Sequence, residues 1–200
     1  MSQIQIQAIL FFFNCCKIWE TQPLGERVSL ESILRTTGVT NADIRQKYIT
    51  NFKFAAKSLG QSLSLQYLSA FLDLLTVACS TQSSFVSELF REQDFSQPFI
   101  ESLLRQSVIN VVLQADRKNE NNPALKQLAV DLQSKVIILL SEMANNRLNE
   151  GFFRKLADGD EYARLFDLIV KQMIEEANKL PIIEFSGELP LNRIERETVD

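Results

Sequence analysis

The spacing of apolar residues is the feature that most restricts the fold of this chain. They recur every three to four positions over most of its length, as in Leu65–Cys79. That spacing gathers side chains on one face of an α-helix, whereas a half-buried strand requires strict alternation. Helix-breaking residues are also scarce, with six glycines and five prolines in 200 residues. We therefore predict an all-α fold, and the length suffices for one or two domains with real cores.

Caps, loops and breakers divide the chain into predicted helices. A helix from about Ser96 should carry Pro98 in its first turn, and a long helix should start at Asn122–Pro123. The middle of the long helix, 136–140, is apolar on every side, so it should be buried against several partners. The predicted helices span about 3–19, 65–79, 85–90, 96–115, 123–145, 152–156 and 161–180. We expect no transmembrane span, because the apolar run at 8–16 is too short.

The segment from Ser29 to Tyr48 is predicted to form a helix-turn-helix. Ser29 is a good N-cap for a first helix, and Gly38 can supply the positive φ that ends it. Thr40 or Asn41 can then cap a second helix, on which Ile44 and Tyr48 share one face. Another helix should restart near Thr50. The second helix of such a motif can enter a DNA major groove.

This segment resembles the operator-binding motif of the tetracycline-repressor (TetR) family. The matching positions are Val28–Ser29, Ile33–Leu34, Gly38–Val39–Thr40, Ala42, Ile44 and Tyr48. The resemblance implies an all-α fold with a three-helix helix-turn-helix domain at 1–58, a larger helical ligand-binding and dimerisation domain at 60–180, and a tail at 181–200. It also implies a homodimer through helices 123–145 and 161–180. A cyclin-like helix pair of the general transcription factor type ends in a similar string, so the motif alone leaves the family open.

In this interpretation the protein is a ligand-responsive repressor of a palindromic double-stranded DNA operator. Arg45 and Lys47 would contact bases and phosphates, and Tyr48 would buttress the helix or touch phosphate. The predicted DNA-binding residues are Ser29, Thr40, Asn41, Ala42, Arg45, Gln46, Lys47, Tyr48 and Lys53. A small apolar ligand would enter among Phe71, Phe99, Leu103 and Phe166, although such aromatic residues are more often plain core.

Enzymatic activity is not expected, because the residues that most chemistries require are missing. The chain has no histidine, which excludes Ser-His-Asp and Cys-His catalysis and histidine–metal sites. We find no glycine-rich phosphate loop and no cysteine pair with zinc spacing, so neither a cofactor nor a metal is expected. The three cysteines form no paired framework, which favours a reducing, cytoplasmic location with buried thiols.

Charge is uneven along the chain. Residues 1–60 hold seven Lys and Arg against four Asp and Glu, although the net charge of the whole is −4. A slightly basic N-terminal segment followed by an acidic remainder suits a DNA-binding domain joined to a dimerisation domain. The alternative is a non-enzymatic α-helical scaffold for protein interactions. The helix pairs after Leu65 support it, because their length and apolar pattern resemble those of armadillo or HEAT hairpins.

Overall fold

The structure is a computed structural model that describes residues 1–27, 38–59, 61–104 and 123–158, together with residues 167, 170 and 174. The described residues are helical and contain no strand, which confirms the all-α prediction. The elements are α1 (Gln3–Thr21), α3 (Asn41–Ala56), α4 (Ser62–Thr81), α5 (Ser83–Arg91), α6 (Gln93–Pro98), α8 (Pro123–Ala144) and α9 (Glu150–Ala157), with short 3₁₀ helices η1 (Leu24–Glu26) and η3 (Arg147–Asn149).

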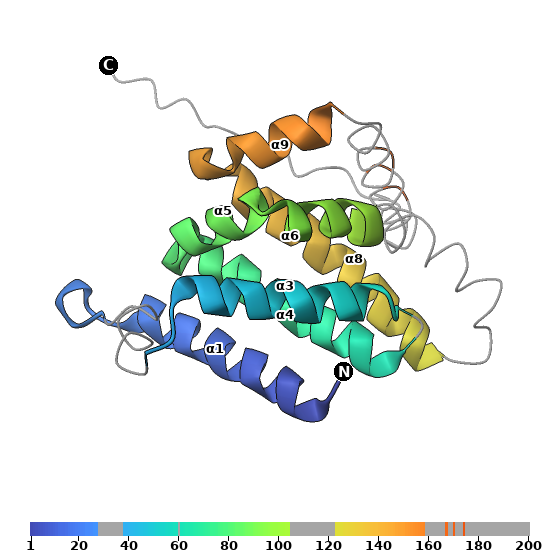
Figure 1. Ribbon diagram of the computed structural model, residues 1–200, viewed down its shortest axis with the longest axis horizontal. Helices are drawn as coiled ribbons and strands as arrows, with labels where there is room; N and C mark the ends of the chain where they lie inside the picture. The colour runs from blue at the N-terminus through green and yellow to red at the C-terminus, as the bar shows by residue number, and fades with distance from the viewer. Residues whose placement is uncertain are drawn as a thin grey trace, which may run out of the picture.

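Helix α4 lies at the centre of the fold. It packs against α1 and α8 along its length and also contacts α3 and α5, as Figure 1 shows. Thirteen of its twenty residues are buried, which is more than one helix face can supply. A helix buried on several sides must be apolar around most of its circumference, and α4 carries no charged residue except Asp73.

The expectation of no membrane span considered only the apolar run at 8–16, and the structure contains a longer apolar helix. Helix α4, with 20 residues, is long and apolar enough to cross a membrane by length and composition. However, 61% of its most apolar stretch is buried inside the protein. A core helix passes the same test, and the packing of α1 and α8 on α4 accounts for its apolar composition.

Aromatic rings fill the core between α3, α4, α5, α6 and α9. Phe52, Phe71, Phe90, Phe95 and Phe99 are 0–1% exposed, and the ring centroids of the pairs in contact lie 4.8–6.2 Å apart. The buried apolar side chains of the described residues form one cluster, which runs from Ile6 in α1 to Leu156 in α9. The predicted boundary between residues 58 and 60 falls between α3 and α4, and the division into domains there stays a prediction.

The structure corrects three details of the predicted helices. Helix α3 continues through Thr50, where a new helix was expected, because no glycine or proline interrupts residues 41–56. The helix expected from Ser96 begins at Gln93 instead, as α6. Pro98 is the last residue of α6 rather than part of its first turn. A π-helical backbone then continues over 99–104. In α8, Ile138 is 51% exposed, so the 136–140 segment is not buried on every side.

The turn before α3 forms as predicted. Gly38 has a φ of +73°, a backbone conformation that residues other than glycine rarely adopt. Thr40 is the N-cap of α3 and forms a capping box with Asp43. The first helix of the predicted motif, and with it Ser29, lies outside the described residues.

Candidate functional site

The outer face of α3 carries part of the predicted DNA-reading set. Thr40, Ala42, Gln46 and Lys47 are exposed in the first two turns of the helix. Their positions are compatible with the predicted role, because side chains at i and i+4 share one helix face. Asn41 is half-buried and points instead to the apolar crevice described below.

Two other predicted DNA contacts, Arg45 and Lys53, form ion pairs with neighbouring helices. Arg45 donates a hydrogen bond to the Glu88 carboxylate of α5, and its side chain is only 18% exposed. The Nζ atom of Lys53 lies 3.5 Å from an Asp94 carboxylate oxygen in α6. Both ion pairs tie α3 to the rest of the fold, so a phosphate would have to compete with a carboxylate for each cation.

Tyr48 is a core residue. Its ring is 9% exposed and packs on Phe71 and Phe85, with centroid distances of 5.3 and 6.1 Å. Burial, the largest cause, raises the pKa of the Tyr48 phenol well above its ordinary value. Of the two predicted roles for Tyr48, the position fits buttressing of the helix and leaves no surface for a phosphate contact.

The residues proposed to line a ligand pocket lie in the packed core. Phe71, Phe99 and Leu103 are each 0% exposed. Phe71 and Phe99 both contact Phe52 and Phe95, so other aromatic rings already occupy the space around them. None of the three lines the apolar crevice between α1, α3, α4 and α5 or the hollow beside α9. Phe166 lies outside the described residues.

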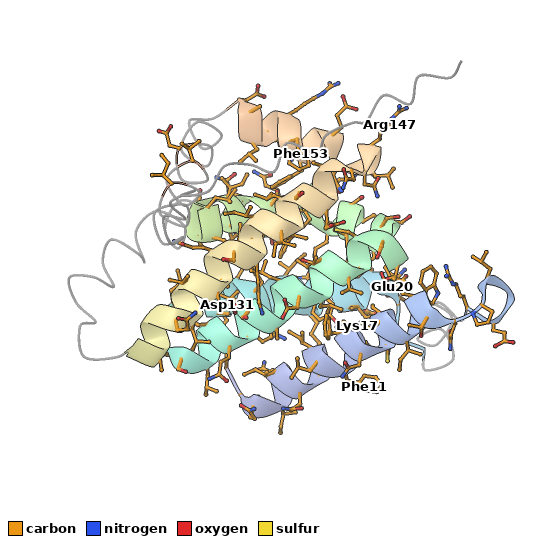
Figure 2. The ribbon with its side chains drawn as sticks, turned by 180° about the vertical axis from the view of Figure 1, so that it is seen from behind. Phe11, Lys17, Glu20, Asp131, Arg147 and Phe153 are labelled. Atoms are coloured by element: carbon orange, nitrogen blue, oxygen red, sulfur yellow. The ribbon has the colours of Figure 1, made fainter. Side chains whose placement is uncertain are left out.

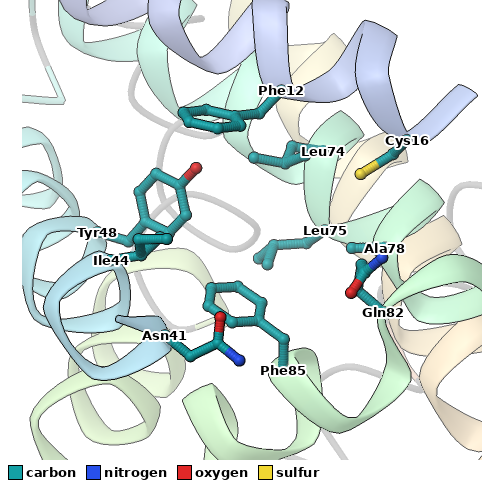
Figure 3. A pocket seen from close by; sticks show the side chains of 10 residues that line it. All are labelled: Phe12, Cys16, Asn41, Ile44, Tyr48, Leu74, Leu75, Ala78, Gln82 and Phe85. Atoms are coloured by element: carbon teal, nitrogen blue, oxygen red, sulfur yellow. The ribbon is translucent and has the colours of Figure 1, made fainter. Parts of the chain in front are cut away.

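An apolar crevice, which was not predicted from the sequence, lies between α1, α3, α4 and α5. Figure 3 shows Phe12 and Leu74 at one end and Asn41 and Phe85 at the other. Its volume is about 40 Å³, which is room for only a few water-sized groups and is far below the roughly 300 Å³ of small ligand sites. The residues lining it are Phe12, Cys16, Asn41, Ile44, Tyr48, Leu74, Leu75, Ala78, Gln82 and Phe85.

A polar cluster joins α4 to α8 and also has no counterpart in the sequence analysis. The Nζ atom of Lys135 lies 2.8 Å from Ser69 Oγ, 2.6 Å from Asp73 Oδ2 and 3.3 Å from Asp131 Oδ2. A serine beside a lysine is one arrangement of a nucleophile and its base. Here the two carboxylates surround the lysine, and Ser69 donates its own proton to Asp131 at 2.9 Å. The geometry is that of an ion-pair link between two helices.

The outer face of α1 exposes large apolar side chains. Ile4, Phe11 and Ile18 are 80%, 64% and 57% exposed, and Figure 2 shows Phe11 at the outer edge of the molecule. They are seven residues apart, so they form one stripe along the helix. Exposed Ala8 and half-buried Cys15 lie between them on the same face. Lys17 and Glu20 are the only charged side chains in α1.

The three cysteines and the acidic residues of the described part of the chain were compared with the geometry of a metal site. Cys16 and Cys79 are buried, Cys15 is half-buried, and all three are free thiols. Burial raises the pKa of Cys16, which makes its thiol a poor nucleophile or ligand. Among the residues that the structure describes, no three cysteine and carboxylate side chains are placed to hold a metal ion.

No family model matches the sequence, and neither a curated protein nor a solved structure is significantly similar to it. Membership of the TetR family therefore stays a prediction from the helix-turn-helix segment.

Proposed function

We propose that the protein is a non-enzymatic helical interaction protein that assembles with a second copy of itself through the outer face of α1. The observation that carries the proposal is the exposed stripe of Ile4, Phe11 and Ile18. Burying a large apolar side chain is worth about 1.5–3 kcal/mol, and this stripe leaves three of them in water on one helix. Apolar residues at such regular spacing, with the small residues Ala8 and Cys15 between them on the same face, are typical of a helix–helix interface.

The order of large and small residues on the stripe fits an antiparallel pair of α1 helices. Large side chains stand at positions 4, 11 and 18, and small ones stand between them at 8 and 15. In an antiparallel pair, Phe11 would lie on Ala8 of the partner subunit while Ile4 would lie on Cys15 of the partner subunit. Phe11 and Ile4 thus each meet a small side chain, which allows the two helix axes to approach closely along this stretch, while Ile18 would lie near the N-terminal end of the partner helix.

The polar neighbours of the stripe lower the cost of burying it. Gln3, Gln7 and Asn14 are exposed beside it and are uncharged. Within α1, Lys17 is the only charged side chain near the face, because Glu20 is directed to α4, where it accepts a hydrogen bond from Ser80 at 2.5 Å. Interface cores are depleted of charge because desolvating an unpaired ion is expensive.

Sedimentation of single-site variants distinguishes this interface from the one that the regulator interpretation requires. Phe11→Glu should convert a dimer to a monomer, because it places a charge at the centre of the paired stripe. Ile138→Glu is the matched control, since Ile138 is 51% exposed on α8, one of the two helices of the predicted bundle dimer. Phe54→Glu on α3, where Phe54 is 55% exposed, tests for an unspecific effect of the added charge.

Each pattern of results has a distinct meaning. A monomer for Phe11→Glu alone supports the α1 pair. If only Ile138→Glu dissociates the dimer, the interface lies in the predicted helical bundle, and the regulator interpretation is favoured. A parent protein that sediments as a monomer at every concentration would overturn self-association altogether.

A transcriptional regulator remains the second candidate, and exposed side chains on α3 favour it. Thr40, Gln46 and Lys47 lie on the open part of that helix, directly after the positive-φ turn at Gly38. Capture of random genomic duplex fragments at rising salt tests it, because phosphate contacts weaken steeply with salt. Enrichment of a palindrome that is lost in the double variant Gln46→Ala/Lys47→Ala, and kept in Lys57→Ala, would establish DNA binding. No enrichment at low salt would exclude it.

A further inference from the structure

Three arginines from three different elements border one hollow at the α9 end of the molecule. Arg91 is the last residue of α5, Arg147 belongs to η3, and Arg154 lies in α9. Figure 2 shows Arg147 beside the end of α8. The hollow has a volume of about 320 Å³, which reaches the lower end of the range for small-molecule sites, roughly 300 Å³. It is unrelated to α1 and to the proposed interface.

The charges around the hollow are unbalanced. Arg91 and Arg147 are exposed and form no ion pair with any residue that the structure describes. Arg154 pairs with Glu150, the one acidic residue that lines the hollow, at 2.6 Å. That pair is exposed on both sides, 76% and 63%, so it holds Arg154 only weakly. The lining therefore carries three positive charges against one negative charge.

Buried contacts fix the floor of the hollow. The rings of Phe90 and Phe152 pack edge to face, with their centroids 4.8 Å apart. Ser87 Oγ donates to Asn149 Oδ1 at 2.9 Å, and Asn149 Nδ2 donates to the Met143 carbonyl at 3.0 Å. These bonds satisfy the buried amide and tie α5 to η3 and the end of α8. The backbone that presents the arginines is thus held in place before any ligand arrives.

The first turn of α9 leaves room beside the arginines. Gly151 lines the hollow, and a Cβ added there would meet nothing within 4 Å. Asn149, the N-cap of α9, makes no capping bond to the helix with its side chain, because that side chain is bound to Ser87 and Met143. Backbone N–H groups of the first turn are therefore not satisfied by a side-chain cap.

We propose that this hollow binds the phosphoryl group of a small phosphate ester. Guanidinium groups present paired N–H donors that match phosphate oxygens, and each bond is charge-assisted. Three guanidinium groups around one site suit a dianion better than a carboxylate, which offers two oxygens and a single charge. A phosphate would displace Glu150 from Arg154 and leave all three arginines directed at its oxygens.

Titration calorimetry on the full chain tests the site, with inorganic phosphate and glycerol 2-phosphate as probes in a constant chloride background. Both probes should bind at one site per chain, and the ester more tightly if the hollow accepts the rest of the molecule. The double variant Arg91→Gln/Arg147→Gln should weaken binding at least about tenfold, since it removes the charge-assisted bonds of two of the three guanidinium groups. Lys155→Gln is its control, because Lys155 is exposed on α9 and does not line the hollow.

Two variants that each remove one acidic side chain distinguish a specific site from general electrostatic attraction of phosphate. Glu150→Gln should bind phosphate more tightly than the parent, because it frees Arg154 and removes the only negative charge from the lining. Asp158→Asn changes the net charge equally, on an exposed residue outside the hollow, and should leave binding unchanged. Equal gains in both variants, or binding that survives loss of the two arginines, would overturn the proposal. Because the oligomeric state is measured separately, failure here leaves the α1 interface untouched.

Discussion

Cys79 makes the stability of this protein sensitive to alkaline pH. The residue lies in α4 and is 8% exposed, and burial raises the pKa of its thiol from 9.0 to about 12, with a smaller contribution from Glu142. Above pH 9 the unfolded chain loses this proton while the folded protein keeps it. The folded state then binds more protons, so the free energy of unfolding falls as pH rises through this window, by at most about 1.4 kcal/mol per pH unit.

Urea unfolding measured from about pH 8 to about pH 11 checks this effect. Cys79→Ala should show a shallower decline of the free energy of unfolding than the parent. The control Leu63→Ala, at an exposed position of α4, changes no titratable group and should keep the parent slope. If the curves of Cys79→Ala and the parent run parallel, the thiol does not titrate as described.

The roles of single charged residues were the hardest to predict. Arg45 was expected to contact DNA, yet it pairs with Glu88, 43 residues further on. Lys135 joins Ser69 and Asp73, which are 66 and 62 residues away. Periodicity shows which face of a helix is polar, but it does not show which distant side chain that face meets. The buried thiols were predictable, because cysteine within an apolar run is usually a small core residue.

At the scale of an element, the capping box of α3 gives a direct test. Thr40 Oγ1 accepts from the Asp43 backbone N–H at 3.1 Å, and the Asp43 carboxylate accepts from the Thr40 backbone N–H at 3.1 Å. Thr40→Ala should lower the free energy of unfolding by about 1 kcal/mol, whereas Thr40→Ser should preserve it. Chemical denaturation with far-ultraviolet circular dichroism measures both. Equal losses in the two variants would show that the cap does not stabilise the helix.

Helix positions followed from the sequence where breakers or caps were present. Gly38 and Thr40 placed the start of α3, and Pro123 placed the start of α8. The break expected near Thr50 had no glycine or proline to support it, and Tyr48, Phe52 and Ala55 continue one helical face. The apolar residues of the stripe on α1 are evident in the sequence. Their exposure was not predictable, because it depends on which face of α1 packs against α4.

At the scale of the whole molecule, the core depends on α4. Leu72 is 0% exposed, so Leu72→Ala should lower the free energy of unfolding by about 2–5 kcal/mol through lost burial and a residual cavity. Leu63→Ala on the same helix, at a position 40% exposed, should cost much less. Urea denaturation compares them. Similar costs for the two substitutions would mean that α4 is not the centre of the packing.

The central place of α4 also bears on the order of folding. Helix α1 precedes α4 by about 40 residues of intervening chain, and α8 follows it after a comparable interval, so its two largest contacts are both distant in sequence. Each requires closure of a long loop before any burial is gained, which slows folding relative to bundles of adjacent helices. During synthesis, the apolar face of α1 that packs on α4 stays exposed until α4 has been made. The face of α4 that packs on α8 stays exposed until α8 has been made. An early nascent chain would therefore expose both helices, and that interval is when a chaperone would be most needed.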